Sequence, residues 1–168
     1  MEYNAFMDTF IIFGAKYLYL VAIAIAVLYF LSSRRKKGIV LFGIIDLVLT
    51  YIVAKVLNHF IINPRPFVSE HVIPLIPHAP DNGFPSDHVL LVSAIAGVLF
   101  CYNRKAGVAV YVLAILIGIS RVLAGIHHWV DVIGSLVIAI AVTVVVYLFT
   151  RKRLIISQKP HHREGSLL

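Results

Sequence analysis

Three short stretches of the sequence combine arginine, histidine and aspartate in patterns suited to binding and transferring a phosphoryl group. They are 64-PRPF-67, 85-PSDH-88 and 120-SRVLAGIHHWVD-131. Arginine presents a planar fork of donors that matches phosphate oxygens, so Arg65 and Arg121 are candidate phosphate ligands. Ser86 is a good helix N-cap, and the free backbone N–H groups that follow it would face an anion.

Two histidines in these stretches could carry the chemistry. His127 and Asp131 are four residues apart and share a face if a helix begins near His127. A carboxylate there would fix the tautomer of the imidazole and stabilise its cationic form. His88 lies in a different stretch and could act as a separate proton donor. Two histidines beside two arginines predict phosphoryl transfer through a phosphohistidine.

Each of these residues also has a simpler interpretation. His127 and Asp131 could form an ordinary hydrogen-bonded pair at the membrane interface, and Arg65 could extend to lipid headgroups. Asp87 could merely complement the dipole of the first helical turn. His128 is expected at the rim rather than as a second catalyst. A zinc site is disfavoured because the arginines would repel a cation, so we predict neither a metal nor a cofactor.

The elements that position these residues are expected to be membrane helices. The chain has 168 residues, of which 60% are hydrophobic and 14% are charged, whereas soluble domains average about 25% charged. In hydrocarbon each segment must pair its own backbone groups, which favours helices over strands. We place helices at about 9–31, 38–62, 86–102, 106–124 and 129–150. The predicted fold is all-α, a polytopic membrane helix bundle with about five or six transmembrane helices.

Basic residues predict the orientation of this bundle. Eleven of the fifteen lysines and arginines fall at 34–37, at 104–105 and in the tail from residue 151. With five helices these places lie on one side, which the positive-inside rule assigns to the cytoplasm. The three motifs then converge at the extracytoplasmic face of the plasma (inner) membrane. The net charge of +7 mostly reflects this topology, and a nucleic-acid partner is disfavoured because exposed aromatics are not interleaved with the basic residues.

The segment 63–85 holds six of the seven prolines. Each proline lacks a backbone donor and fixes φ, so we expect no helix in this segment. A connection of this length is more typical of a functional loop than of a simple linker.

Taken together, the three stretches resemble the phosphatidic-acid-phosphatase type 2 superfamily. The pattern of that family is Lys-x(6)-Arg-Pro, then Pro-Ser-Gly-His, then Ser-Arg-x(5)-His-x(3)-Asp. The third motif is the most specific, and the sequence matches it in full at Ser120, Arg121, His127 and Asp131.

The other two motifs match with one departure each. Asp87 stands at the position of the glycine in the second motif, and Asn58 stands at the position of the lysine in the first. Lys55 lies one helical turn before Asn58. We count Asn58 and Asp87 with the candidate phosphate-binding residues.

Pro-Arg-Pro-Phe, Phe-Pro-Ser-Asp-His and a small five-helix body are similar to undecaprenyl-diphosphate phosphatases of the bacitracin-resistance type, over about residues 40–135. The resemblance implies that His127 is the nucleophile, that Asp131 orients it and that His88 protonates the leaving group. It also implies metal-independent catalysis and a role in recycling a peptidoglycan precursor. The phosphate would be held by Arg65, Ser86 and Arg121.

We therefore expect a membrane-embedded phosphatase domain at 1–150 and a basic cytoplasmic tail at 151–168. Its partners would be membrane lipids and a polyprenyl or other lipid phosphate. Within the superfamily, phosphatidylglycerophosphate and phosphatidate phosphatases and lipid phosphotransferases remain alternatives. From other classes, a non-catalytic lipid-binding protein would not need His127, and a transporter would place its charges near the bilayer midplane.

Overall fold

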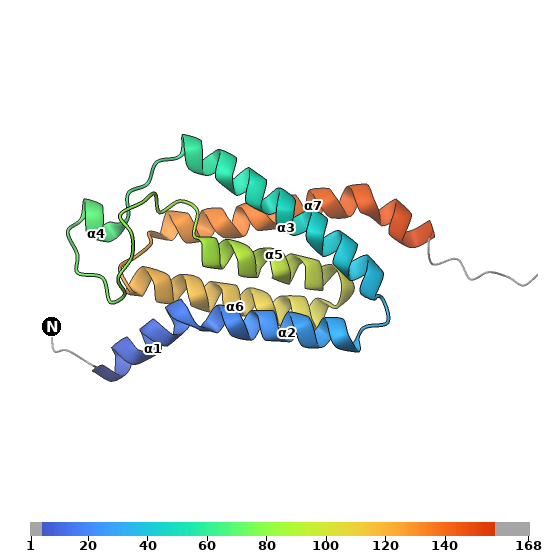
Figure 1. Ribbon diagram of the computed structural model, residues 1–168, viewed down its shortest axis with the longest axis horizontal. Helices are drawn as coiled ribbons and strands as arrows, with labels where there is room; N and C mark the ends of the chain where they lie inside the picture. The colour runs from blue at the N-terminus through green and yellow to red at the C-terminus, as the bar shows by residue number, and fades with distance from the viewer. Residues whose placement is uncertain (1–4, 157–168) are drawn as a thin grey trace, which may run out of the picture.

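The structure, a computed structural model, describes residues 5–156, which form an elongated bundle of helices (Figure 1). The prediction of an all-α membrane bundle is confirmed. The helices are α1 (Ala5–Lys16), α2 (Leu18–Ser32), α3 (Lys36–Phe60), α4 (Pro66–Ser69), α5 (Asp87–Tyr102), α6 (Arg104–Leu123) and α7 (Trp129–Ile156).

Helix α5 lies at the centre of the bundle and packs against α2, α3, α6 and α7. Nearly every turn of α5 contributes buried residues, and most of them are apolar. A helix that is apolar all round is expected to be enclosed by others. Two of the apolar clusters of the core contain α5 side chains, one with α2 and α6 and the other with α3 and α7. The position of the N-terminus of α5 is therefore fixed from several sides.

Helices α3, α6 and α7 are each long and apolar enough to cross a membrane, and α1 with α2 makes a further span if the bent pair is counted as one. Helix α5 is apolar but has only 16 residues. At 1.5 Å per residue this corresponds to about 24 Å, less than the roughly 30 Å of a hydrocarbon core. The sequence indicated a short third helix at 86–102, and the structure begins it one residue later.

The first predicted helix, 9–31, is wrong as a single element because it is broken at Tyr17. Helices α1 and α2 meet there at 44°, and the backbone of Tyr17 departs from helical values at φ −123° and ψ −21°. Near the break, Arg121 Nη1 donates a hydrogen bond to the carbonyl oxygen of Ala15 at 3.1 Å. A side chain that reaches into the backbone ladder is an established cause of a sharp bend. The bend brings α1 against α6.

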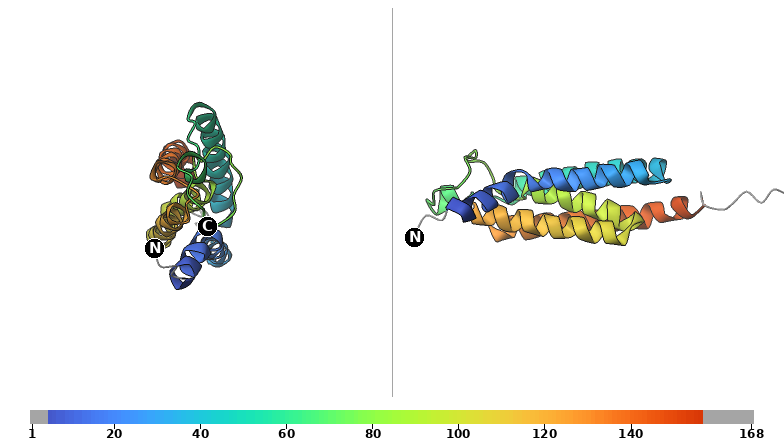
Figure 2. Two further views of the ribbon diagram at one scale, coloured as in Figure 1. Left: turned by 90° about the vertical axis from the view of Figure 1, so that its left-hand side faces the viewer. Right: turned by 90° about the horizontal axis from the view of Figure 1, so that it is seen from below.

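The 63–85 segment crosses one end of the bundle (Figure 2). The expectation that this segment contains no helix was wrong for one turn, α4, which begins at Pro66. Proline is tolerated at the first position of a helix because its missing N–H would have no partner there. The backbone N–H of Leu75 donates to Ala124 O at 3.0 Å, and that of Gly83 donates to Asn63 O at 2.8 Å. These bonds tie the segment to the α6–α7 turn and to its own beginning.

The two ends of the bundle differ in composition. The α2–α3 and α5–α6 connections and the end of α7 lie at one end, opposite the 63–85 segment and the α6–α7 turn (Figure 1). The three motifs therefore lie at the end away from the basic connections. Helix α7 continues to Ile156 rather than ending at 150. The predicted tail at 151–168 lies mostly outside the described residues.

Candidate active site

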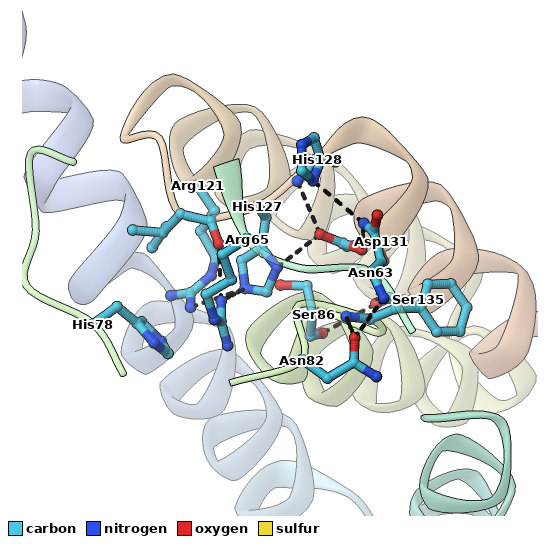
Figure 3. A network of polar contacts seen from close by, with 12 residues as sticks. Asn63, Arg65, His78, Asn82, Ser86, Arg121, His127, His128, Asp131 and Ser135 are labelled. Atoms are coloured by element: carbon cyan, nitrogen blue, oxygen red, sulfur yellow. Dashed lines mark hydrogen bonds and ion pairs between the residues drawn. The ribbon is translucent and has the colours of Figure 1, made fainter. Parts of the chain in front are cut away.

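His127 lies between two arginines and an aspartate (Figure 3). Its Nδ1 is 3.2 Å from Asp131 Oδ2, and its Nε2 is 3.1 Å from Arg65 Nη1 and 3.2 Å from Arg121 Nη2. Because a guanidinium carries only donors, Nε2 must be the acceptor. The proton of the neutral ring is then on Nδ1, where it is donated to the carboxylate. The lone pair of Nε2 is thus directed at the point where the two arginines converge.

The His127 side chain is 1% exposed. Burial lowers the pKa of His127 to about 4; the nearby Arg121 and Arg65 lower it as well, and together they outweigh the opposite effect of Asp131. The imidazole is therefore neutral at pH 7. This is the state in which a ring nitrogen can attack phosphorus.

Asp131 is fully buried and accepts three hydrogen bonds. Besides His127, the backbone N–H of His128 donates to Oδ2 at 2.8 Å, and Asn63 Nδ2 donates to Oδ1 at 2.7 Å. The carboxylate is thus held in one orientation, and so is the ring that it contacts. His128 lies at the rim of the site, where its Nε2 is 3.1 Å from Glu70 Oε1.

The two arginines are buried, each at 4% exposure. Arg65 Nε donates to Asp81 Oδ1 at 2.7 Å, and its Nη1 donates to Ile126 O at 2.8 Å. Among the described residues, no carboxylate lies within ion-pairing distance of Arg121, whose Nη1 donates to the carbonyl of Ala15 and whose Nε has no hydrogen-bond partner. A buried cation without a counter-ion is costly. Its position next to His127 therefore suits an anionic ligand.

Ser86 and the start of α5 form one side of the site, next to His127 (Figure 3). Ser86 occupies the N-cap position, but its hydroxyl makes no capping bond, contrary to the simplest expectation for serine there. Its Oγ is buried and lacks a partner among the described residues. Ser135 Oγ holds the Ser86 carbonyl at 3.1 Å. The first N–H groups of α5 have no acceptor within the helix. Arg121 Nε and the Ser86 hydroxyl are therefore two buried polar groups of this site that lack a hydrogen-bond partner among the described residues.

His88 is half-buried on α5, with its ring edge-on to that of Tyr19 at 4.8 Å between centroids. Arg121 and His127 are near enough to influence His88 electrostatically. The structure therefore places His88 at the same end of the bundle as His127 and Asp131, and its role as a proton donor stays a prediction.

Asn58 and Asp87 lie beside this centre rather than at it. The side-chain amide of Asn58 donates to the carbonyl of Phe84. Asn58, Asp87, Lys55 and Arg65 line a polar cavity of about 120 Å³. Lys55 and Asp87 also line an apolar groove of about 420 Å³ between α3 and α5, so the cavity and the groove adjoin.

The motif pattern did not indicate four residues that contribute to this site. Asn63 and Asp81 orient Asp131 and Arg65, Ala15 offers a backbone carbonyl to Arg121, and His78 places its ring 6.4 Å from that of His127. The one signal for His78 and Asp81 is their position in a long proline-rich loop that has to fold over the motifs.

Comparison with known proteins gives consistent matches. The model of the PAP2 superfamily matches residues 40–155. The chain is 35% identical over 154 residues to Undecaprenyl-diphosphatase BcrC of Bacillus subtilis (strain 168), which covers 89% of this chain and 78% of that protein.

Two crystal structures are similar in fold. The structure of Aquifex aeolicus LpxE superposes with a TM-score of 0.68 at 25% identity, covering 88% of each chain. The structure of a transmembrane PAP2-type phosphatidylglycerolphosphate phosphatase from Bacillus subtilis gives a TM-score of 0.60 at 26% identity, covering 95% of this chain and 79% of that one.

Proposed function

Because the chain belongs to the PAP2 superfamily and is a membrane lipid phosphatase, we propose that it hydrolyses undecaprenyl diphosphate to the monophosphate and inorganic phosphate. The reaction takes place at the extracytoplasmic face of the plasma (inner) membrane and recycles a lipid carrier of cell-wall synthesis. The relative that is 35% identical is named for this activity, which supports the choice of substrate.

The observation that carries the proposal is the placement of His127 Nε2 between two buried guanidiniums, with Asp131 on the other side of the ring. The terminal phosphate of the substrate takes over the donors of Arg65 and Arg121, which frees the Nε2 lone pair. Nε2 attacks phosphorus and the bond to the bridging oxygen breaks. Asp131 stabilises the ring as it becomes positively charged.

His88 completes the cycle. It donates a proton toward the departing lipid phosphate, and the same group then accepts a proton from the water that attacks the phosphohistidine. Inorganic phosphate leaves and His127 returns to its neutral form. Ser86 and the N–H groups at the start of α5 hold the phosphate oxygens during both steps.

Two features support a lipid diphosphate over other ligands of the site. The polar cavity beside Arg65 adjoins an apolar groove between α3 and α5, which provides a path for a lipid chain. The ionisable groups of the candidate site lie at one end of the bundle, whereas transporter sites lie near the midplane. Phosphatidylglycerophosphate remains the alternative substrate, since a protein of similar fold is named as a phosphatase of it.

A panel of detergent-solubilised lipids tests the substrate. Phosphate release is measured from undecaprenyl diphosphate, phosphatidylglycerophosphate and phosphatidate, each with and without EDTA, and a second lipid is added to detect transfer. We expect the highest kcat/KM for undecaprenyl diphosphate, with no effect of EDTA. A higher kcat/KM for a glycerolipid, or transfer in place of release, would show that the proposed reaction is wrong.

Cysteine labelling tests the membrane face. In a Cys101→Ala background, Ile73→Cys places a thiol at a residue that is 93% exposed in the 63–85 segment, and Lys105→Cys places one at the opposite end. An impermeant thiol reagent added to intact cells should label the first and not the second. The reverse pattern would put the site in the cytoplasm.

A further inference from the structure

His78 is held over the site by the fold of the 63–85 segment. Two residues before it, Ile76 is 5% exposed and packs with Ala15, Ala124 and Ile126. The neighbouring Leu75 donates its backbone N–H to Ala124 O. This part of the segment is thus fixed to the α6–α7 turn that carries His127. The placement of His78 follows from these packed neighbours and not from its own side chain.

The His78 ring faces the same space as His127. The two ring centroids are 6.4 Å apart at an interplanar angle of 72°, and Figure 3 shows His78 beyond the two arginines, on the side away from Asp131. A phosphoryl group held beside His127 by the two arginines therefore faces the His78 ring, and one of its oxygens can come within about 3 Å of a His78 nitrogen.

The His78 ring has only loose partners in the described structure. Its Nδ1 is 3.4 Å from Ala79 O and 3.9 Å from Asp81 Oδ1, and the same Asp81 oxygen accepts the much shorter bond from Arg65. The side chain is 28% exposed. The ring is therefore free to turn toward a ligand without breaking a strong hydrogen bond.

The charges around His78 oppose its protonation when the site is empty. Burial lowers the pKa of His78, and Arg65 and Arg121 lower it further, against the opposite effects of the Ala79 carbonyl and Asp81. His127 and His88 also face this region. A bound phosphoryl anion cancels the influence of the arginines, so it reverses the balance of charge at the ring.

We propose that His78 is a third histidine of the site, which takes up a proton as the phosphoryl anion binds between Arg65 and Arg121 and donates a hydrogen bond to it. This inference rests on the proposed function only in that a phosphoryl group occupies the site. It gives the 63–85 segment a second contact with the phosphoryl group, in addition to that of Arg65. A charge-assisted hydrogen bond of this kind is stronger than one between neutral groups.

Inorganic phosphate, the product, is the probe for this contact. Its inhibition constant is measured between pH 5.5 and 8.5 for the wild type, His78→Asn and His78→Ala, using whichever lipid phosphate the wild type turns over. We expect His78→Asn to weaken phosphate binding about tenfold near pH 6 and hardly at all at pH 8.5. Taking the ratio of variant to wild type removes the titration of phosphate itself.

The control is His71→Asn in the same segment. His71 has φ 56°, a conformation that asparagine tolerates, and its variant should bind phosphate like the wild type at every pH. A role of His78 in merely holding the loop predicts a loss that does not change with pH. That result, or a ratio of one throughout, would overturn the proposal. Absence of undecaprenyl-diphosphate hydrolysis by the wild type would instead count against the proposed substrate alone.

Discussion

The two nitrogens of the His127 ring have partners of opposite kind, and this decides what the residue can do. Asp131 accepts a hydrogen bond from the Nδ1–H group, while Arg65 and Arg121 donate to Nε2. In the empty site the Nε2 lone pair is engaged by the two arginines that we propose to hold the phosphate. Under this proposal, binding of the substrate and exposure of the nucleophile are one event.

Substitution of His127 is expected to remove turnover entirely, because the covalent route has no other attacking group. Asp131→Asn keeps the shape of the side chain but loses the charge that stabilises the imidazolium, and we expect a loss of about 10²–10⁴-fold. Single-turnover experiments with labelled substrate should trap an acid-labile phosphoenzyme in the wild type and none in His127→Ala. A phosphoenzyme in His127→Ala would place the nucleophile elsewhere.

The acid limb of the pH profile should report His127. Its pKa is lowered to about 4 by burial and by the arginines, so the attacking neutral ring persists as pH falls through 6.5 and is lost only near pH 4. From this residue alone, kcat/KM should stay level above about pH 5 and fall tenfold per unit well below 4. An acid limb centred near 6.5 that persists in both His78→Asn and His88→Asn would contradict this expectation, because His127 would then titrate like an exposed imidazole.

His88 should matter most when the leaving group is poor. A lipid monophosphate expels an alkoxide, whereas a prenyl diphosphate expels a phosphate monoester that departs without much help. General acid assistance accelerates a reaction by about 10²–10⁴-fold, and the upper end of this range should apply when an alkoxide leaves. His88→Ala should therefore reduce single-turnover hydrolysis of phosphatidate more than that of undecaprenyl diphosphate. Equal losses on both lipids would exclude His88 as the leaving-group acid.

The convergence of three candidate catalytic residues could be predicted from the sequence because they follow one another at helical or near-helical spacing. Arg121, His127 and Asp131 belong to one continuous stretch, and the structure brings them together. Asp81 and His78 could not be assigned in the same way, since their contacts depend on how a long irregular segment folds back. The partner of Arg121, the Ala15 carbonyl, carries no side-chain signal at all.

At the level of helices, α1 packs against α6 and supports the site. It does so although it precedes the part of the chain matched by the family model. It reaches α6 through Gly14, where an added Cβ would lie 2.2 Å from Ser120 Oγ and 2.9 Å from Ser120 Cβ. Only glycine permits this close approach. The approach also brings the Ala15 carbonyl within reach of Arg121.

Gly14→Ala should displace α1 and with it the hydrogen bond that orients Arg121. We expect a loss of about 10- to 100-fold in kcat/KM, since small displacements of a positioning group are costly to catalysis. Gly43→Ala in α3 is the matched control, because its Cβ would only touch Val98 at an ordinary 3.7 Å. Activity of Gly14→Ala equal to that of Gly43→Ala would mean that α1 does not position the arginine.

Most helix bounds could be predicted from apolar runs, but the break between α1 and α2 could not. Residues 9–31 contain no proline, so the local pattern favours a single helix. The bend arises where Arg121, more than a hundred residues later, donates to Ala15. Tertiary contacts of this kind cannot be recognised from the local sequence. The single turn of α4 could not be predicted from the local sequence either.

On the scale of the whole molecule, the chemistry is confined to one end and the basic connections to the other (Figure 1). The product phosphate can therefore leave into water directly, while the lipid product remains beside the bundle. The long 63–85 segment lies across this end and contributes Arg65 and Asp81 to the site. The two products therefore leave the site in different directions, one into water and the other into the membrane.

The shortness of α5 has a consequence for the surrounding bilayer. Its 16 residues extend about 24 Å. If the C-terminus of α5 lies at one surface of a bilayer of ordinary thickness, its N-terminal amides lie roughly a helical turn below the other surface. A substrate headgroup must sink by that amount, or the bilayer must thin around the protein. Such hydrophobic mismatch costs fractions of a kcal/mol per ångström.

In proteoliposomes of phosphatidylcholines with monounsaturated chains of increasing length, kcat/KM should fall several-fold from the thinnest to the thickest bilayer, at equal amounts of correctly oriented protein. A rate independent of chain length would show that the headgroup reaches α5 without deforming the membrane.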